Sequence, residues 1–378
     1  MQRKGLGMAA TIGIVCALAL EIFFALYSAR FPSLFRLEPD PGGVRLDGAR
    51  RFFEAPTFDP RLGWDADPSA RGGAAGTTVL AQSYGDSFTR GAEVGDADTW
   101  QSRFGALTGT AIVNLGVNGY GLDQAVLKHE MIGRLYPAPV AILGIYAEEY
   151  RRAGSWYAWT CLAGGDPLDY FRYAFKPMFL PVNGTWRLRE PPCQDAACIV
   201  AFLGRPNADL ERVLAVHDRC ARENLARPPR RFPYTLHFLQ AMATTLRSRR
   251  VVSPTANPFF DSPESLARAE FLIGRFVTES RRRGQAPLVL LLYSERELPL
   301  LEGGARPDGL LLRFLREQRI PFVDTGEVLL AHRRKHGGRG SLSAPMGHLT
   351  PDGNALVADA LARHPLLRNA VKAPGGTR

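Results

Sequence analysis

The sequence lacks internal repeats and low-complexity tracts of any length, which excludes a repeat array, and its 378 residues contain only one long apolar run. Arginine supplies most of the formal charge of +10, but neither aromatic interleaving nor a nucleic-acid motif accompanies its clusters. We therefore expect no nucleic-acid partner. The clusters are typical of a solvated surface, and a surface that favours anionic lipid headgroups or an acidic polysaccharide is the weaker alternative.

Cysteines are few, and their spacing favours disulfides over a metal site. Of the five, four lie outside the apolar run, all in the central part of the chain. An even number in an exported domain suggests disulfides, and of the three possible pairings the spacing favours Cys193 with Cys198, which leaves Cys161 with Cys220. A zinc site is the alternative to disulfides, but two cysteines separated by four residues, without a second close pair, have poor spacing for zinc ligands. We expect disulfides and no metal.

The apolar run covers about residues 5–27, is interrupted only by Glu21, and is long enough to cross a bilayer. Arg3 and Lys4 before it place the N-terminus in the cytoplasm. A cleaved signal peptide is the main competitor, but the run exceeds a usual signal core and no convincing small-x-small cleavage site precedes Arg30. We expect a single-pass anchor in the inner membrane, an extracytoplasmic (periplasmic) domain, and Glu21 near the outer interface.

The remaining sequence predicts one domain interrupted by an insertion. Trp64, in the arm that follows the anchor, is expected to be a packing residue. Within the insertion, Asn183-Gly184-Thr185 formally matches a glycosylation acceptor, but Asn-Gly is also a hairpin signal and the turn is favoured. The expected segments are an anchor (1–30), a tether and arm (31–76), the first half of the domain (77–150), an inserted cap (151–258), the second half (259–366) and a tail (367–378).

Five apolar runs separated by helical patterns indicate a parallel sheet with helices on both faces. The binding crevice of such a sheet lies outside the carboxyl ends of its strands. Ser87, Gly119 and Glu148 each follow a run closely and should meet at this rim. His348 precedes the last helical segment, for which Thr350 is the expected N-cap. The runs are residues 77–81, 111–115, 140–145, 287–293 and 320–323.

Three short segments carry the candidate chemistry. Tyr84-Gly85-Asp86-Ser87-Phe88 lies at a strand-to-helix turn, where a serine hydroxyl is close to unpaired backbone N–H groups. Asn114-Leu115-Gly116-Val117-Asn118-Gly119-Tyr120-Gly121 follows the second apolar run, and Gly347-His348-Leu349-Thr350-Pro351-Asp352-Gly353 lies near the C-terminus. Each segment alone matches an ordinary turn, but their order, serine first and histidine last, does not follow from turn chemistry.

With these segments in this order, the chain resembles the SGNH/GDSL hydrolase superfamily over about residues 58–365, and in particular its membrane-anchored bacterial members with an insertion before the fourth strand. The resemblance implies a flavodoxin-like SGNH fold, with a parallel five-stranded sheet flanked by helices. It also implies that Ser87 is the nucleophile, that His348 is the general base, and that the backbone N–H groups of Ser87 and Gly119 form an oxyanion hole. No cofactor is implied.

Two features of the family are missing. Glu148 takes the place of an asparagine that donates to the oxyanion, and an ionised glutamate only accepts hydrogen bonds. Pro345 and Met346 occupy the places of the aspartate that orients the histidine. Another group must then hold the imidazole, and the candidates are a backbone carbonyl, Glu148, Glu149 and Asp324. An ion pair with Arg151 or Arg152 is an equally plausible role for Glu148 and Glu149.

These observations support three hypotheses. The first is an extracytoplasmic serine-dependent ester hydrolase or O-acyltransferase with an acyl-Ser87 intermediate, acting on esters of an envelope polysaccharide or lipid. The second is a non-catalytic protein of the same fold that binds carbohydrate or lipid in envelope assembly, and the missing asparagine and aspartate motivate it. The third is an assembly protein for polymer export, supported only by the anchor and the arginine clusters. No protein partner is indicated.

Overall fold

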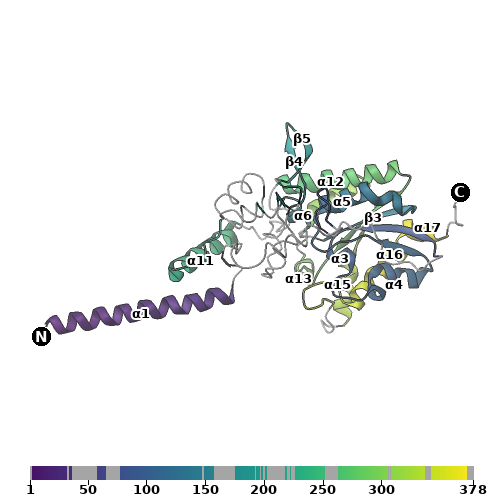
Figure 1. The fold of residues 1–378 in the computed structure, drawn as a ribbon. Coiled ribbons are helices and arrows are strands. Elements are labelled where there is room, and N and C mark those ends of the chain that lie inside the picture. The colour runs from purple at the N-terminus through teal and green to yellow at the C-terminus, as the bar shows by residue number, and fades with distance from the viewer. Residues whose placement is uncertain are drawn as a thin grey trace.

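Five short strands form one parallel sheet in the computed structural model (Figure 1), with the spatial order β2-β1-β3-β6-β7. This is the flavodoxin-like order, in which the chain reverses direction beside its first strand. The prediction of a five-stranded parallel sheet flanked by helices is confirmed. The strands are β1 (Val79–Tyr84), β2 (Ala111–Asn114), β3 (Val140–Tyr146), β6 (Ala286–Leu292) and β7 (Phe322–Asp324).

The structure describes most of the sheet domain and parts of the remaining chain. The described residues are 2–31, 34–35, 58–64, 77–146, 149–156, 175–191, 193–195, 197–198, 201, 218, 222, 226–251, 263–295, 297–304, 306, 308–336 and 342–372.

Helices cover both faces of the sheet (Figure 1). On one face α5 (Leu122–Ile132) packs beside α12 (Pro263–Arg282), and on the other α16 (Pro351–Arg363) packs between α4 (Trp100–Thr108) and α15 (Thr325–Lys335). Because β3 and β6 are covered on both sides, nearly all their side chains are buried, which explains their continuous apolar sequence. The other helices are α3 (Ser87–Arg90), α6 (Glu149–Arg152), α13 (Leu298–Glu302), α14 (Gly309–Glu317), α17 (Pro365–Lys372), and the 3₁₀ turns η2 (Asp96–Asp98) and η3 (Gly133–Leu135).

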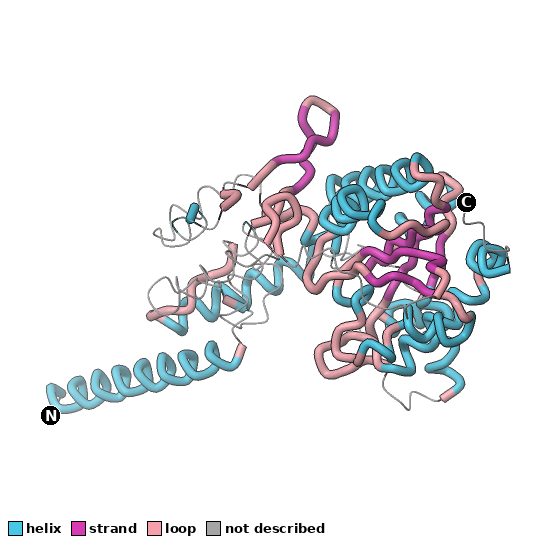
Figure 2. The backbone as a smooth tube through the Cα atoms, turned by 45° about the vertical axis from the view of Figure 1, so that its right-hand side comes forward, coloured by secondary structure: helices cyan, strands magenta, loops and turns pink. Residues whose placement is uncertain are grey.

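A β-hairpin projects from the sheet domain at the top of Figure 2. It consists of β4 (Met178–Val182) and β5 (Thr185–Arg189), which pair antiparallel. Asn183 and Gly184 connect them with φ of 50° and 75°, the backbone that a two-residue hairpin turn requires. The turn predicted at this Asn-Gly pair is therefore confirmed.

The N-terminal apolar segment forms one long helix, α1 (Gln2–Arg30), which lies apart from the sheet (Figures 1 and 2). Residues 11–30 have the length and mean hydropathy, 2.1, of a membrane span. A second long helix, α11 (Tyr234–Val251), packs alongside it. The sequence did not predict this pairing.

Candidate active site

Ser87 is the first residue of α3, three residues beyond the end of β1. The N-cap residue Asp86 accepts a hydrogen bond from the Phe88 N–H at 2.8 Å. Gly85 has φ of 155°, and a Cβ there would lie 2.6 Å from the Gly144 carbonyl oxygen. Glycine is thus required for the strand to turn and present Ser87 at the rim. Because α3 has only four residues, its dipole contributes little at Ser87.

Ser87 and His348 meet although 261 residues separate them. The Ser87 Oγ and His348 Nε2 atoms are 2.8 Å apart. The histidine lies in a turn that closes through hydrogen bonds from the Ala344 N–H to the His348 carbonyl and from the Gly347 N–H to the Ala344 carbonyl. Thr350 caps α16 immediately afterwards, as the sequence predicts.

Glu93 is the residue that holds His348, and no sequence pattern predicts this role. Its Oε2 atom is 2.7 Å from His348 Nδ1 and also accepts the His348 backbone N–H at 3.2 Å. Its Oε1 atom accepts the Met346 N–H at 2.9 Å. The carboxylate therefore binds the turn at the point where the family places an aspartate side chain, but it comes from the opposite side, six residues after Ser87.

The backbone of Glu93 is unusual as well. Its φ is 67°, a left-handed conformation that non-glycine residues seldom adopt outside turns and functional sites. It follows Gly91, which ends α3 in the same region of backbone space. Glu149 and Asp324, two of the candidates proposed from the sequence, are not the orienting group, because Glu149 accepts from the Asp86 and Tyr146 N–H groups and Asp324 pairs with Arg306.

The electrostatics favour an ionised Glu93. Partial burial raises the pKa of this carboxyl, but the hydrogen bonds from Met346 and His348 outweigh it and hold the pKa below its ordinary value. A carboxylate only accepts hydrogen bonds, so His348 Nδ1 carries a proton toward Glu93 and Nε2 is left to accept from the Ser87 hydroxyl. This is the tautomer that a general base requires.

Aromatic rings fix the imidazole from one side. The Phe88 ring lies 5.0 Å from the His348 ring and stacks on Tyr146 at 4.0 Å, centroid to centroid. Phe88 and Tyr146 are almost fully buried, whereas the His348 and Glu93 side chains are each 16% exposed. The histidine is thus held firmly but remains open to a small substrate.

The loop with Gly119 is anchored from two directions. The Trp64 indole N–H donates to the Asn118 carbonyl at 2.9 Å, so this tryptophan packs on the domain as expected, and the Arg152 guanidinium donates to the Tyr120 carbonyl at 2.6 Å. Gly119 has φ of 77°. Within the described part of the chain, neither its N–H nor that of Ser87 donates a hydrogen bond, so both remain available as oxyanion donors.

A buried charge cluster lies behind the serine turn. Arg152 pairs with Asp86 at 3.0 Å, and both side chains are almost completely buried. Burial and the negative charge of Asp86 raise the pKa of Glu149 well above its ordinary range, despite Arg152. Both effects favour the protonated form of Glu149. Glu148, which occupies the place of the family asparagine, lies outside the described residues.

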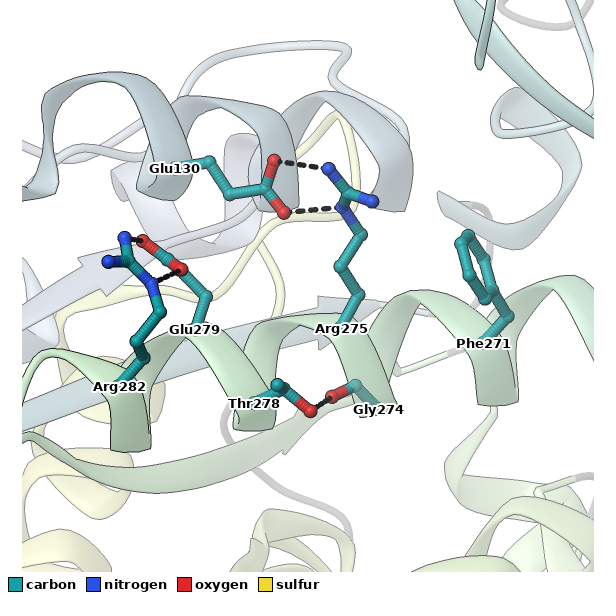
Figure 3. Close-up of a pocket in the computed structure, with 7 residues that line it drawn as sticks. All are labelled: Glu130, Phe271, Gly274, Arg275, Thr278, Glu279 and Arg282. Carbon is teal, nitrogen blue, oxygen red and sulfur yellow. Dashed lines mark hydrogen bonds and ion pairs between the residues drawn. The ribbon is translucent and has the colours of Figure 1, made fainter. Parts of the chain in front are cut away.

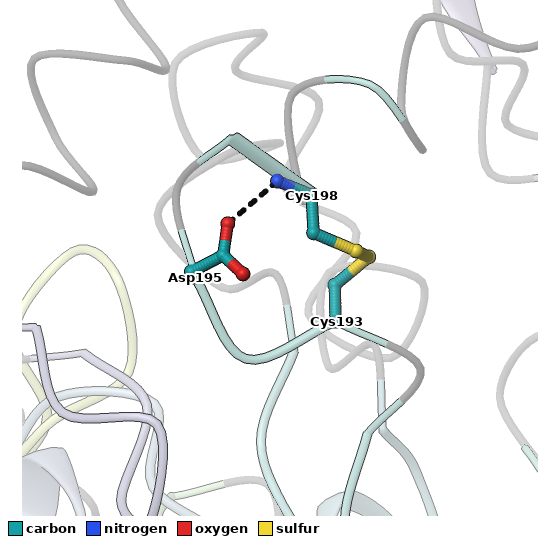
Figure 4. Close-up of a disulfide and its surroundings, with 3 residues drawn as sticks. All are labelled: Cys193, Asp195 and Cys198. Atoms are coloured by element: carbon teal, nitrogen blue, oxygen red, sulfur yellow. Dashed lines mark hydrogen bonds between the residues drawn. A yellow bond between two sulfur atoms is a disulfide. The ribbon is translucent and has the colours of Figure 1, made fainter.

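The predicted bond between Cys193 and Cys198 is present (Figure 4). The Cys198 N–H donates to Asp195 Oδ1 inside the loop that the disulfide closes. Cys161 and Cys220 lie outside the described residues, so their expected pairing stays a prediction.

A groove between α5 and α12 is lined by residues outside the segments that carry Ser87, Gly119 and His348 (Figure 3). Its charged side chains are already paired, with Arg275 donating to Glu130 and Arg282 to Glu279. Neither Ser87 nor His348 lines it. Among the described residues, no group of three or more acidic, histidine or cysteine side chains is placed to hold a metal ion.

Comparisons with known proteins find similarity only at the level of structure. No family model and no curated protein matches the sequence. A member of the lipolytic protein G-D-S-L family from Veillonella parvula superposes with a TM-score of 0.36 at 11% identity, covering 75% of this chain and 96% of its own. A catalytic mutant of the acetylxylan esterase Axe2 from Geobacillus stearothermophilus gives 0.39 at 10% identity, covering 76% and 94%.

At these scores the superpositions carry no functional inference. The strand order and the positions of Ser87 after β1 and His348 before α16 come from the chain itself. These features give the chain a flavodoxin-like α/β fold in which a serine and a histidine meet at the carboxyl edge of the sheet, the arrangement that the resemblance to SGNH/GDSL hydrolases implies.

Proposed function

We propose that the protein is a serine-dependent ester hydrolase or O-acyltransferase that works through an acyl-Ser87 intermediate. The observation that carries this proposal is the continuous hydrogen-bonded chain from Ser87 Oγ through the His348 imidazole to Glu93, with distances of 2.8 Å and 2.7 Å. A nucleophile, a base and an orienting acid in this geometry define acyl-transfer chemistry on several unrelated folds.

Acylation begins when Ser87 Oγ attacks the carbonyl carbon of an ester and His348 Nε2 takes the hydroxyl proton. The carbonyl oxygen becomes an oxyanion, which the N–H groups of Ser87 and Gly119 stabilise, each contributing roughly 3 kcal/mol to the transition state. The ionised Glu93 stabilises the imidazolium that forms. His348 then returns the proton to the leaving alkoxide, so the alcohol departs and the acyl group stays on Ser87.

Deacylation reverses these roles. His348 takes a proton from an incoming hydroxyl, whose oxygen attacks the acyl carbon, and Ser87 leaves with the returned proton. If water is the nucleophile the product is a carboxylic acid, and if a sugar or lipid hydroxyl enters instead the acyl group is transferred. Both outcomes use the same three residues, so the acceptor decides between hydrolase and transferase.

The proposed setting is the outer face of a membrane. The apolar helix α1 supports a tether, and Arg3 and Lys4 at its start favour a cytoplasmic N-terminus, with the catalytic domain outside. Esters on an envelope polysaccharide or on a lipid are the substrates that an enzyme held there would meet.

Two missing family residues, an asparagine and an aspartate, motivated the competing proposal of a non-catalytic binding protein, and one of these observations still supports it. Glu93 supplies the acid that appeared to be missing, whereas Glu148 still replaces the asparagine donor. If the native protein were inert and Glu148→Asn produced esterase activity, the binding hypothesis would be preferred.

Hydrolysis of p-nitrophenyl acetate by the full chain in detergent micelles tests the enzyme proposal. We expect saturable turnover that disappears in Ser87→Ala and persists in Ser102→Ala, a matched change in α4 outside the site. Turnover that survives in a folded Ser87→Ala protein would exclude an acyl-Ser87 intermediate.

A further inference from the structure

The N-terminus of α11 is capped by an acidic residue from the apolar helix. The Glu21 carboxylate accepts the Tyr234 N–H at 2.6 Å and the Thr235 N–H at 3.1 Å, and so satisfies two of the unpaired N–H groups at the start of α11. Carboxylates are favoured at this end of a helix by its dipole. Glu21 therefore has a structural partner in the extracytoplasmic part of the chain.

From Glu21 onward one face of α1 packs against α11, while Ile22, Phe23 and Leu26 on its other face stay more than half exposed. The Phe24 ring stacks on Phe238 at 4.5 Å, and Tyr27 meets the same ring edge-on at 5.3 Å. Ser28 of α1 and Ala241 of α11 are both 1% exposed. The contacts advance in the same direction along both helices, so α11 runs parallel to the last third of α1.

The contacts described between α1 and α11 begin at Glu21. Residues 11–20 are all exposed, and nearly all are apolar. The apolar run from Gly5 to Tyr27 spans about 34 Å at the α-helical rise, close to the hydrocarbon thickness of a bilayer, and Glu21 lies about 9 Å before its outer end. Because contact with α11 begins at Glu21, this residue marks the boundary between the inner part of the membrane span and a stalk that is paired with α11.

The loop that leads into α11 consequently lies at the membrane surface. This headgroup loop, residues 227–233, precedes the residue that Glu21 caps, so it lies at the depth of Glu21, near the outer end of the apolar part of α1. It carries three prolines and no regular structure, and such backbone is excluded from the hydrocarbon core but not from the interface.

The exposed side chains of the loop suit an anionic interface. Phe232 is 70% exposed, and the adjacent Arg230 and Arg231 are exposed as well. An aromatic ring can insert at the boundary between headgroups and acyl chains, while two adjacent cationic side chains pair with lipid phosphate groups. His237 Nδ1 lies 2.9 Å from the Arg231 carbonyl oxygen and ties the loop to the first turn of α11.

We propose that the headgroup loop is a second membrane contact, in which Phe232 enters the outer leaflet and Arg230 and Arg231 bind anionic lipid headgroups. Together with the Glu21 cap it fixes the depth and tilt of the stalk, and thereby holds the catalytic domain at a set height above the bilayer. The inference rests on the membrane tether of the proposed function but not on its serine chemistry.

Photocrosslinking of the full chain in nanodiscs tests the contact. Benzoylphenylalanine is introduced at Phe232, at Leu18 in the lipid part of α1, or at Leu246, which is 53% exposed three turns along α11, and lipid adducts are measured by intact mass. We expect adducts at positions 18 and 232 and none above background at 246. Adducts at 18 alone would overturn the loop contact, adducts at all three would overturn a boundary at Glu21, and none at 18 would overturn the tether itself.

The headgroup preference needs a separate comparison. In phosphatidylglycerol nanodiscs the double change Arg230→Gln and Arg231→Gln should lower the adduct yield at position 232 to the level seen in phosphatidylcholine. The same pair of changes at Arg313 and Arg316, exposed on α14, is the charge-matched control and should leave the yield unaltered. Equal yields in both lipids would overturn recognition of anionic headgroups.

Discussion

Replacing Glu93 with glutamine removes one negative charge and leaves the shape of the side chain unchanged. Three N–H groups converge on this carboxylate: those of Met346 and His348, and the His348 ring nitrogen Nδ1. An amide has one oxygen, and placing it at the Oε2 position keeps both bonds to His348 at the expense of the bond to Met346. This orientation retains two of the three bonds, so the tautomer of His348 should survive in Glu93→Gln.

The loss of rate then comes from the missing charge beside the imidazolium. Removing the acid from a serine-protease triad costs about four orders of magnitude, which includes a wrong tautomer. With the tautomer retained we expect a smaller loss in kcat, about 10²- to 10³-fold or roughly 2.7–4.1 kcal/mol. In Glu93→Ala, where orientation is lost as well, kcat should fall about 10⁴-fold.

The assay is kcat from steady-state p-nitrophenol release at saturating substrate and neutral pH, with thermal unfolding as a check that each variant is folded. Glu327→Gln, a change at an exposed glutamate in the first turn of α15, is the matched control and should retain full activity. A folded Glu93→Gln protein within about threefold of the wild-type kcat would refute the role of Glu93 as the orienting acid.

Three further predictions concern the scaffold of the site. Because the folded pKa of Glu93 is lowered, its contribution to stability is complete above the unfolded pKa near 4.5 and is lost as pH falls through the folded value, so the difference in melting temperature between wild type and Glu93→Gln should shrink on acidification below about pH 4.5. Gly85→Ala should destabilise the fold by roughly 2–4 kcal/mol in denaturant titrations, since its Cβ would lie 2.6 Å from the Gly144 carbonyl oxygen, and a neutral effect would mean that the turn is not tight. Arg152→Met leaves Asp86 buried without its cation and should cost roughly 3–5 kcal/mol by the same measurement, whereas an unchanged midpoint would show that the pair is unimportant.

Much of the fold could be predicted because its signals are local. The apolar runs of β3 and β6 predict buried parallel strands, and the Asn183-Gly184 pair predicts a hairpin turn, from neighbouring residues alone. Ser87 and His348 were identified as a pair through family resemblance, and the structure places their polar atoms within hydrogen-bonding distance.

Glu93 could not be predicted because its role depends on a long-range contact. The gap at Pro345 and Met346 indicated that some other group must orient the histidine, but no pattern marks a glutamate in a left-handed turn after α3. The sequence left a backbone carbonyl, Glu148, Glu149 and Asp324 open as candidates, and the structure gives Glu149 and Asp324 other partners. Burial directs Glu149 toward the serine turn, and Arg306 binds Asp324.

The pairing of α1 with α11 escaped prediction for the same reason. Glu21 alone predicts only a carboxylate near the outer interface, and the first residues of α11 show no helix-capping side chain of their own. The cap comes from a residue 213 positions away.

Covalent labelling of the full chain with a fluorophosphonate tests the activated serine most directly. Intact mass and peptide mapping should show one adduct, on Ser87, that is absent in Ser87→Ala, absent in His348→Ala, and formed more slowly in Glu93→Gln. A folded protein that takes up no label, or that is labelled on another residue, would contradict the assignment of Ser87, His348 and Glu93 as a catalytic triad.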